Sequence, residues 1–121
     1  MRGMATTQRD SLPVAPPEVD LDRAVEVLRL LADRTRLAVL QMLTGTEMPV
    51  TAIAEALDRP VPAISQHLAK LRAGHLVTSR REGTSVYYAP ATEHVEALVT
   101  NVLHHTEHML YPRPPHHVRE A

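Results

Sequence analysis

The sequence contains no cysteine among its 121 residues, which excludes disulfide bonds and thiolate ligands for a metal. Aromatic side chains are nearly absent as well, because there is no tryptophan or phenylalanine and the three tyrosines are Tyr87, Tyr88 and Tyr111. Proteins that bind single-stranded nucleic acid stack its bases on aromatic side chains. The scarcity of aromatic residues therefore disfavours that class of partner.

Long apolar runs are missing too. No stretch approaches the roughly 20 apolar residues that a membrane-spanning helix needs, and no apolar signal segment follows Met1. We therefore expect no membrane partner and a cytoplasmic location. With 44% hydrophobic residues, a chain of this length is expected to form one small domain over residues 18–110. A disordered arm over residues 1–17 and a flexible histidine-bearing tail over 111–121 are expected to flank it.

Residues 51–90 carry the pattern of a winged helix-turn-helix. Apolar residues at helical spacing follow Thr51, which can cap a helix. Pro60 and Pro62 then interrupt the chain, and a second helix follows. That helix is expected to end at Gly74, a residue suited to the left-handed cap conformation. The second helix of such a unit has the right size to enter the DNA major groove.

A two-stranded hairpin is expected directly after this helix pair. Residues 76–81 and 84–89 are rich in β-branched or aromatic side chains, and Glu82 and Gly83 between them form a two-residue turn signal. The fold class predicted by this order is mainly α with a β-hairpin wing.

The distribution of charge supports a nucleic-acid partner although the net charge is only −1. Residues 59–81 contain five cations and no acid, whereas the segments on both sides are net negative. The five cations are Arg59, Lys70, Arg72, Arg80 and Arg81. The positive charge therefore gathers on the expected DNA-binding unit, although solvated surface cations without a partner are the plainer alternative.

Positions within the motif predict separate roles at double-stranded DNA. Ser65 and Gln66 lie early on the exposed face of the second helix and are expected to approach base edges. His67 has two interpretations, since it can point to DNA or pack beside the first helix of the motif. Phosphate contacts are expected from Lys70 at the far end of the helix and from the wing. The full set of expected DNA contacts is Thr51, Ala63, Ser65, Gln66, His67, Lys70, Arg80, Arg81 and Thr84.

Three further helices are expected around the motif. Asp20 can cap a helix over residues 21–31, and Asp33 can cap another that Gly45 ends. The last helix is expected over residues 92–109. The first and last helices carry more apolar surface than so small a domain can bury, so we expect a homodimer through them. A twofold dimer would place two recognition helices on successive turns of a palindromic operator.

Histidine is concentrated near the C-terminus. On a helix that turns about 100° per residue, His94 and His105 point within about 20° of each other and His108 lies about 40° to the other side of His94. His94 and His105 are roughly 16 Å apart along the helix, too far to share an ion held at about 2 Å. Two antiparallel helices across a twofold axis can bring His94 of one subunit to His105 and His108 of the other. This spacing predicts two metal sites per dimer, with simply exposed histidines as the alternative.

The wider set of metal candidates extends along the helix and into the tail. It consists of His94, His105, His108, His104, His116, His117 and Glu93. His104, Glu107 and His108 also match the H-x-x-E-H pattern of an inverted zinc peptidase. Only 13 residues follow His108, too few for the downstream ligand and the substrate cleft of such an enzyme, so no enzyme is expected. A metal buffer without a DNA role leaves the cluster of cations unexplained.

Three segments resemble one known family. They are L-A-D-R-T-R-L-A-V-L before the motif, I-S-Q-H-L-A-K-L-R in the second helix and R-E-G-T-S-V-Y-Y in the wing. Over roughly residues 20–110 the chain looks like a member of the ArsR/SmtB family of metal-sensing transcriptional repressors. Members that sense metal on the last helix share four ligand positions across the dimer, which fall here on Thr92, His94, His105 and His108. Thr92 replaces the expected aspartate, and a histidine at 108 with a histidine-bearing tail is similar to the nickel- and cobalt-sensing branch.

The resemblance implies a repressor that metal binding releases from its operator. Ni(II) is the expected ion, followed by Co(II) and Zn(II), because nickel and cobalt accept more than four nitrogen and oxygen ligands whereas zinc is satisfied by four. A zinc-responsive repressor, a metal-linked activator and metal acting as co-repressor stay open, since the residues do not fix the sign of the response.

Overall fold

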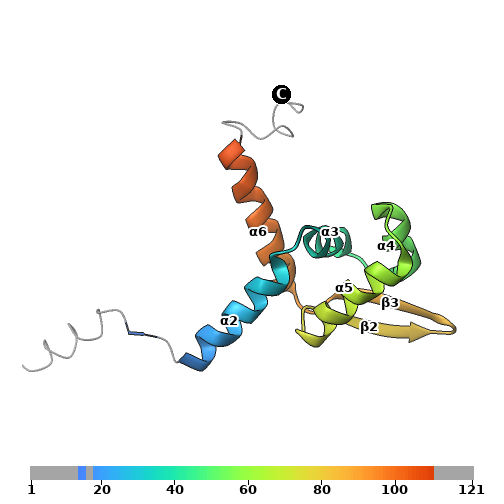
Figure 1. Cartoon of the computed structure of the whole chain (residues 1–121), viewed down its shortest axis with the longest axis horizontal. Coiled ribbons are helices and arrows are strands. Elements are labelled where there is room, and N and C mark those ends of the chain that lie inside the picture. Colours follow the sequence, from blue (N-terminus) through green and yellow to red (C-terminus); the bar gives the residue numbers. More distant parts are fainter. Residues whose placement is uncertain (1–13, 16–17, 111–121) are drawn as a thin grey trace, which may run out of the picture.

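The computed structural model describes residues 14–15 and 18–110 of the chain. In chain order the elements are α2 (Glu18–Leu31), α3 (Arg34–Leu43), β1 (Met48–Pro49), α4 (Val50–Leu57), α5 (Val61–Ala73), β2 (Val77–Glu82), β3 (Ser85–Pro90) and α6 (Glu93–Leu110) (Figure 1). The expected fold class, mainly α with a β-hairpin wing, is confirmed. All of the expected arm except residues 14–15, and the whole of the expected tail, fall outside the described residues.

Helix α3 lies at the centre of the fold and packs against α2, α4, α5, α6 and β3. Its buried side chains meet apolar residues from both helices of the motif and from the start of α6, because each of these helices repeats its apolar residues at helical spacing. The fully buried side chains that form this core are Val39, Leu40, Leu43, Ile53, Ile64, Leu68, Leu71, Val77 and Val99.

The sheet has three strands in the order β1-β3-β2, all antiparallel. Strand β1 is only two residues long, and it pairs Met48 with Tyr88 and Pro49 with Tyr87. Two residues are too few to show an alternating pattern, and proline is tolerated only at a sheet edge, so this strand could not be predicted from the sequence. The pairing fastens the base of the β2–β3 wing to the segment that precedes α4.

Two helix starts differ from the sequence-based prediction. Helix α2 begins at Glu18, so Asp20 lies inside it and is not its cap; acids are favourable throughout the first turn of a helix, not only at its cap. Helix α4 begins at Val50 after Pro49, which has extended geometry and no side-chain cap, and Thr51 lies inside the first turn. Asp33 does cap α3, since its Oδ2 accepts a hydrogen bond from the Arg36 backbone N–H at 2.9 Å.

The end of α5 and the hairpin turn also differ by one residue. Gly74 has a φ of −87°, and the left-handed conformation belongs to His75 at φ 63°. Glu82 pairs with Ser85, so the loop of the hairpin is Gly83 and Thr84, with Gly83 at φ 64°. Gly74 serves close packing instead, because a Cβ there would lie 2.2 Å from Cδ1 of Leu30.

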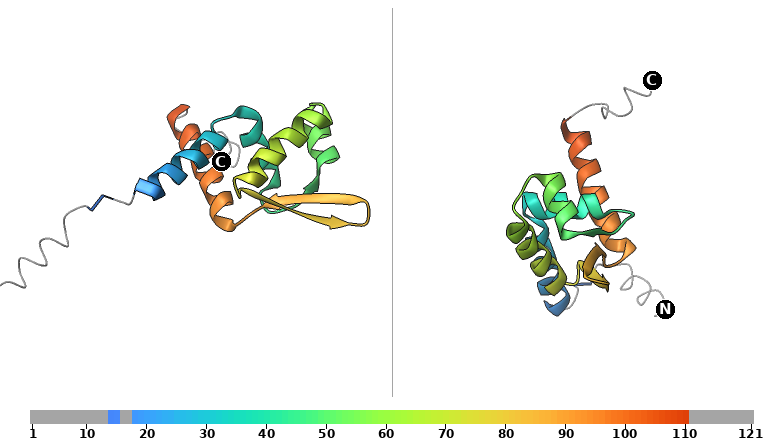
Figure 2. Two further views of the ribbon diagram at one scale, coloured as in Figure 1. Left: turned by 60° about the horizontal axis from the view of Figure 1, so that its bottom comes forward. Right: turned by 90° about the vertical axis from the view of Figure 1, so that its right-hand side faces the viewer.

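Helices α2 and α6 project from the same side of α3, and the wing extends from the opposite side (Figures 1 and 2). Both helices carry large exposed apolar side chains, with Leu28 57% and Met109 71% exposed. The remaining ones on these two helices are Leu21, Val25, Val102 and Leu110. Within the described residues, no helix is long and apolar enough to cross a bilayer.

Candidate nucleic-acid interface and metal-ligating residues

Helix α5 presents a polar face to solvent because its apolar residues are all directed at the core. Pro60 and Pro62 at its start set the extended entry and the first turn. Ser65, Gln66 and Lys70 are exposed, as the sequence predicted for a face that meets DNA. Of the other expected contacts near this face, Ala63 is half-buried and Thr51 is exposed on α4.

The wing brings two neighbouring arginines to opposite sides of strand β2, since successive side chains of a strand alternate. Arg81 is exposed, and so is Thr84 at the hairpin tip. Arg80 is bound by carboxylates. Its Nε lies 3.0 Å from both carboxylate oxygens of Glu47, its NH2 contacts Glu47 as well, and its NH1 lies 2.7 Å from Oε1 of Glu82.

Arg80 is further fixed by the ring of Tyr87, whose centroid lies 4.9 Å from the guanidinium carbon. The hydrogen bonds donated by Arg80 hold the pKa of Glu47 below its ordinary value, and those to Glu47 and Glu82 raise the pKa of Arg80. In the free protein Arg80 is therefore paired internally, whereas Arg81 faces solvent. The sequence reasoning missed Glu47, because only the pairing of β1 with β3 brings it beside the wing.

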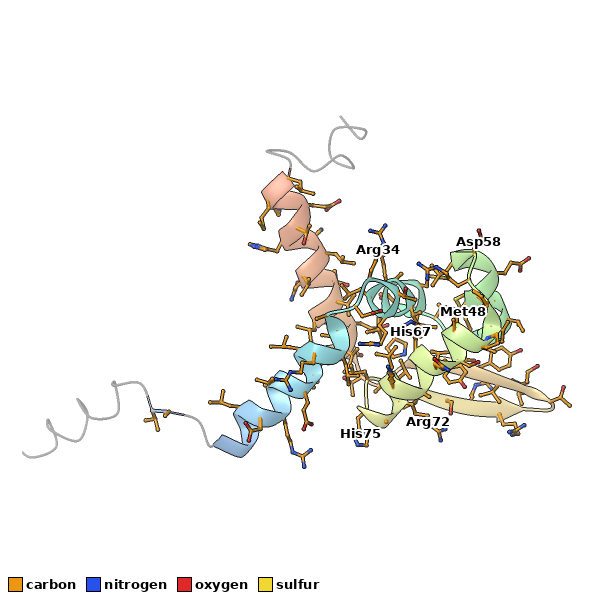
Figure 3. The ribbon with its side chains drawn as sticks, in the orientation of Figure 1. Arg34, Met48, Asp58, His67, Arg72 and His75 are labelled. Atoms are coloured by element: carbon orange, nitrogen blue, oxygen red, sulfur yellow. The ribbon has the colours of Figure 1, made fainter. Side chains whose placement is uncertain are left out.

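His67 is turned from the exposed face of α5 toward the start of α3, and its printed contacts are with this helix and not with α4, the first helix of the motif (Figure 3). Its Nδ1 lies 3.3 Å from NH1 of Arg36 and 3.9 Å from Oδ2 of Asp33. Its side chain is 24% exposed. His67 therefore contacts the helix that supports α5, and Arg36, a partner that sequence reasoning did not single out, holds it there.

Histidines of α6 lie along its exposed surface. His94, His105 and His108 are all exposed, and so is Glu93 in the first turn. Among the described residues, no group of three or more histidines and carboxylates is placed to hold one ion. Thr92 precedes the helix, and its Oγ1 accepts a hydrogen bond from the Val95 backbone N–H at 3.3 Å. Threonine at this position is thus used as a helix cap.

His104 belongs to another side of the same helix. Together with Glu107 it lines an apolar groove of about 510 Å³ between α3 and the second half of α6. The rings of His104 and His108 lie edge to face with their centroids 6.3 Å apart. His104 is therefore close to His108 but does not share the stripe of His94 and His105. His116 and His117 lie outside the described residues.

The pair α4 and α5, the left-handed break at Asp58 (φ 54°) and the β2–β3 wing define a winged helix-turn-helix of the DNA-binding class. Residues 31–80 match the family model described as a helix-turn-helix domain. The chain belongs to the ArsR/SmtB family of transcriptional regulators. This family consists of DNA-binding regulators, so the protein is not an enzyme and the H-x-x-E-H match is incidental.

Three relatives show the extent of the similarity. The chain is 44% identical over 108 residues to the transcriptional regulator KmtR of Mycobacterium tuberculosis, covering 89% of this chain and 83% of that protein. It is 37% identical over 95 residues to the transcriptional repressor SmtB of the same species, covering 78% and 70%. The solution structure of the homodimeric winged helix-turn-helix domain of Mb0332 from Mycobacterium bovis, described as a possible ArsR-family regulator, matches with a TM-score of 0.74 and 33% identity, covering 84% and 96%.

Proposed function

We propose that this protein is a metal-responsive transcriptional repressor that acts in the cytoplasm as a homodimer on a palindromic operator. Ni(II) or Co(II) would bind at sites shared between two α6 helices and change the affinity for DNA. The observation that carries the proposal is the position of His94 and His105 on α6. They lie within about 80° of the exposed apolar residues Val102 and Met109 on a helix that turns about 100° per residue.

The exposed apolar surface supports a dimer through α2 and α6. Leu21, Val25 and Leu28 are spaced at i, i+4 and i+7, so they form one stripe on α2. A second copy that covers this stripe and Val102 of α6 would bury apolar area that a monomer leaves in water. The homodimeric solution structure of Mb0332 supports a homodimer, and the repressor SmtB supports repression as the activity.

The dimer would also complete the metal site. His94 and His105 are too far apart along one helix to share an ion, but antiparallel packing of two α6 helices would bring His94 of one subunit to His105 and His108 of the other. His104, Glu93, His116 and His117 are further candidates for this site. An excess of imidazole donors favours nickel or cobalt over zinc, because both accept more than four ligands. A zinc-responsive repressor and a metal-linked activator are the alternatives.

A mixed dimer tests the shared site. The variants H94A and H105A should each abolish tight Ni(II) binding when both subunits carry the same change. In a heterodimer of one H94A and one H105A subunit, both losses fall on the same composite site, so one intact site should remain. Isothermal titration with Ni(II) counts the sites. Two sites or none in the heterodimer would refute the intersubunit geometry.

A further inference from the structure

Leu30, near the end of α2, is connected to the recognition helix α5 by two routes, one direct and one through α3. Its side chain packs so closely on Gly74 that a Cβ at that position would lie 2.2 Å from Leu30 Cδ1. Its backbone oxygen accepts a hydrogen bond of 2.6 Å from Nε of Arg36 on α3. A displacement of the end of α5 relative to the end of α2 therefore requires Leu30 to move as well.

Arg36 extends the second route to His67. The same guanidinium that binds the Leu30 carbonyl places NH1 3.3 Å from Nδ1 of His67. A guanidinium can only donate, so Nδ1 must accept and the proton of a neutral imidazole must be on Nε2. Asp33 fixes the backbone of Arg36 in the first turn of α3, because its Oδ2 accepts a hydrogen bond from the Arg36 backbone N–H at 2.9 Å. One side chain of α3 thus joins α2 to the inner face of α5.

The two faces of α2 have different partners. Leu30 is half-buried against the DNA-binding unit, whereas Leu21, Val25 and Leu28 are exposed on the face that the proposed dimer covers. A change in the packing of two subunits would reposition α2 as a rigid helix. Since Leu30 is at the inner end of that helix, the change would reach α5 through the contacts just described.

We infer that Leu30, Arg36 and His67 form a mechanical link that carries the position of α2 to the recognition helix, and that His67 is a positioning residue and not a DNA contact. This inference rests on the proposed function, because the signal it transmits is the metal-dependent geometry of the dimer. The link is the differential contact through which two dimer states present α5 differently to DNA.

Four variants test the link, with a duplex from the DNA upstream of the protein's own gene and Ni(II) as probes. H67L fills the same space without an acceptor, H67N keeps an acceptor near the position of Nδ1, and R36M removes both hydrogen bonds. R34M removes an exposed arginine from the same helix and is the matched control. The measured quantity is the ratio of the dissociation constants for DNA with and without Ni(II).

The expected result is a loss of at least about fivefold in that ratio for H67L and R36M, with H67N and R34M within about twofold of the wild type. Ni(II) affinity and dimerisation should be unchanged in all four. The ratio in H67L and H67N carries the test if R36M fails to fold. A merely structural or DNA-contacting His67 would change the affinity for DNA but leave the ratio intact.

The outcomes separate the two proposals. A wild-type protein whose DNA affinity does not respond to Ni(II), Co(II) or Zn(II) contradicts the proposed function. A normal wild-type response that survives in H67L and R36M overturns the link alone. The imidazole tautomer of His67, measured by ¹⁵N NMR in the metal-free protein, is an independent check: a proton on Nδ1 overturns the link whatever metal does.

Discussion

Two arginines of the wing differ in their surroundings although they are neighbours in the sequence. Arg80 and Arg81 are adjacent and chemically identical, yet Arg80 is bound by Glu47 and Glu82 whereas Arg81 is exposed. A phosphate that approached Arg80 would have to compete with two carboxylates. Surface ion pairs are weak enough for such an exchange. If the wing binds DNA as proposed, Glu47 would therefore reduce its attraction for phosphate until the exchange occurs.

The variant E47Q should strengthen DNA binding, because it releases part of Arg80 for phosphate. Each additional phosphate contact raises the magnitude of the salt slope of log K by about 1. Fluorescence anisotropy at several salt concentrations measures both quantities. E26Q removes the same charge from an exposed position on α2 and is the control. Equal effects of E47Q and E26Q would show that only the net charge matters.

The exposed amide of Gln66 should discriminate between base pairs, since it lies early on α5 and is not held by the core. Q66A should weaken specific binding by about 1–3 kcal/mol and leave binding to random DNA nearly unchanged. K70A, which removes a proposed phosphate contact, should weaken both equally. Competition assays with specific and random duplexes compare the two. An equal loss on random DNA for Q66A would contradict base recognition.

At the scale of elements, helix α3 supports every other helix, so its start is a sensitive point. The backbone N–H of Arg36 lowers the pKa of Asp33 below its ordinary 3.8 by donating to the ionised carboxylate. A folded-state pKa that is lowered stabilises the protein above the unfolded value, and this contribution is lost as the pH falls through the lowered value. The cap of α3 thus weakens only in acid.

D33A should lower the free energy of unfolding by about 1 kcal/mol at neutral pH. The difference from the wild type should shrink once the pH falls below 3.8, because both proteins then lack the ionised cap. Urea denaturation at equal protein concentration measures it. D22A removes an exposed carboxylate from α2 and serves as control. A difference that stays constant into acid would show that capping by the charged group is not the cause.

Elements marked by a local sequence pattern could be predicted, whereas contacts between residues far apart in the sequence could not. The spacing of Ile64, Leu68 and Leu71 predicts α5 and its buried face, and all three are fully buried. Strand β1 has no periodic signal, and the orientation of His67 depends on Arg36, 31 residues earlier in the chain. The fold was therefore predictable from local patterns. The partners of Arg80 and His67 were not, because tertiary packing decides them.

The candidate metal site divides in the same way. Helical spacing predicts that His94, His105 and His108 share one exposed surface, and all three are exposed on α6. It cannot predict the partner helix that would complete a site. The spacing also turns His104 about 80° away from His94 on a helix of about 100° per residue, and His104 lines the groove beside α3.

At the scale of the whole molecule, a single substitution in the exposed apolar stripes of α2 and α6 should have its largest effect on dimerisation. L28E replaces an apolar side chain of the proposed interface by a charged one. Because each dimer contains two copies of residue 28, the substitution should weaken the dimer at least about 100-fold. Sedimentation equilibrium measures the association. R23Q changes the net charge by the same amount on the far side of α2, since five positions at about 100° turn it well away from Leu28. A dimer that survives L28E would contradict the interface.

Truncation of the tail tests whether the protein binds nickel or zinc. Removing residues 112–121 takes away His116 and His117 but keeps the histidines of α6. A four-coordinate zinc site would be nearly unaffected, whereas a nickel site of higher coordination should lose affinity and octahedral character in its absorption spectrum. Metal-free DNA binding should be unchanged and is the control. An unchanged nickel spectrum would leave His108 as the remaining support for nickel over zinc.

Because Leu21, Val25 and Leu28 of α2 are exposed in a single subunit, the state of the protein depends on its own concentration. A subunit that leaves these side chains in water gains by association, so the fraction of paired chains follows the number of copies in the cell. At low copy number the population would consist mainly of single subunits, each with one recognition helix and half of every composite metal site. A gene that controls its own transcription through such a protein would therefore adjust both how much repressor is present and how readily it senses metal.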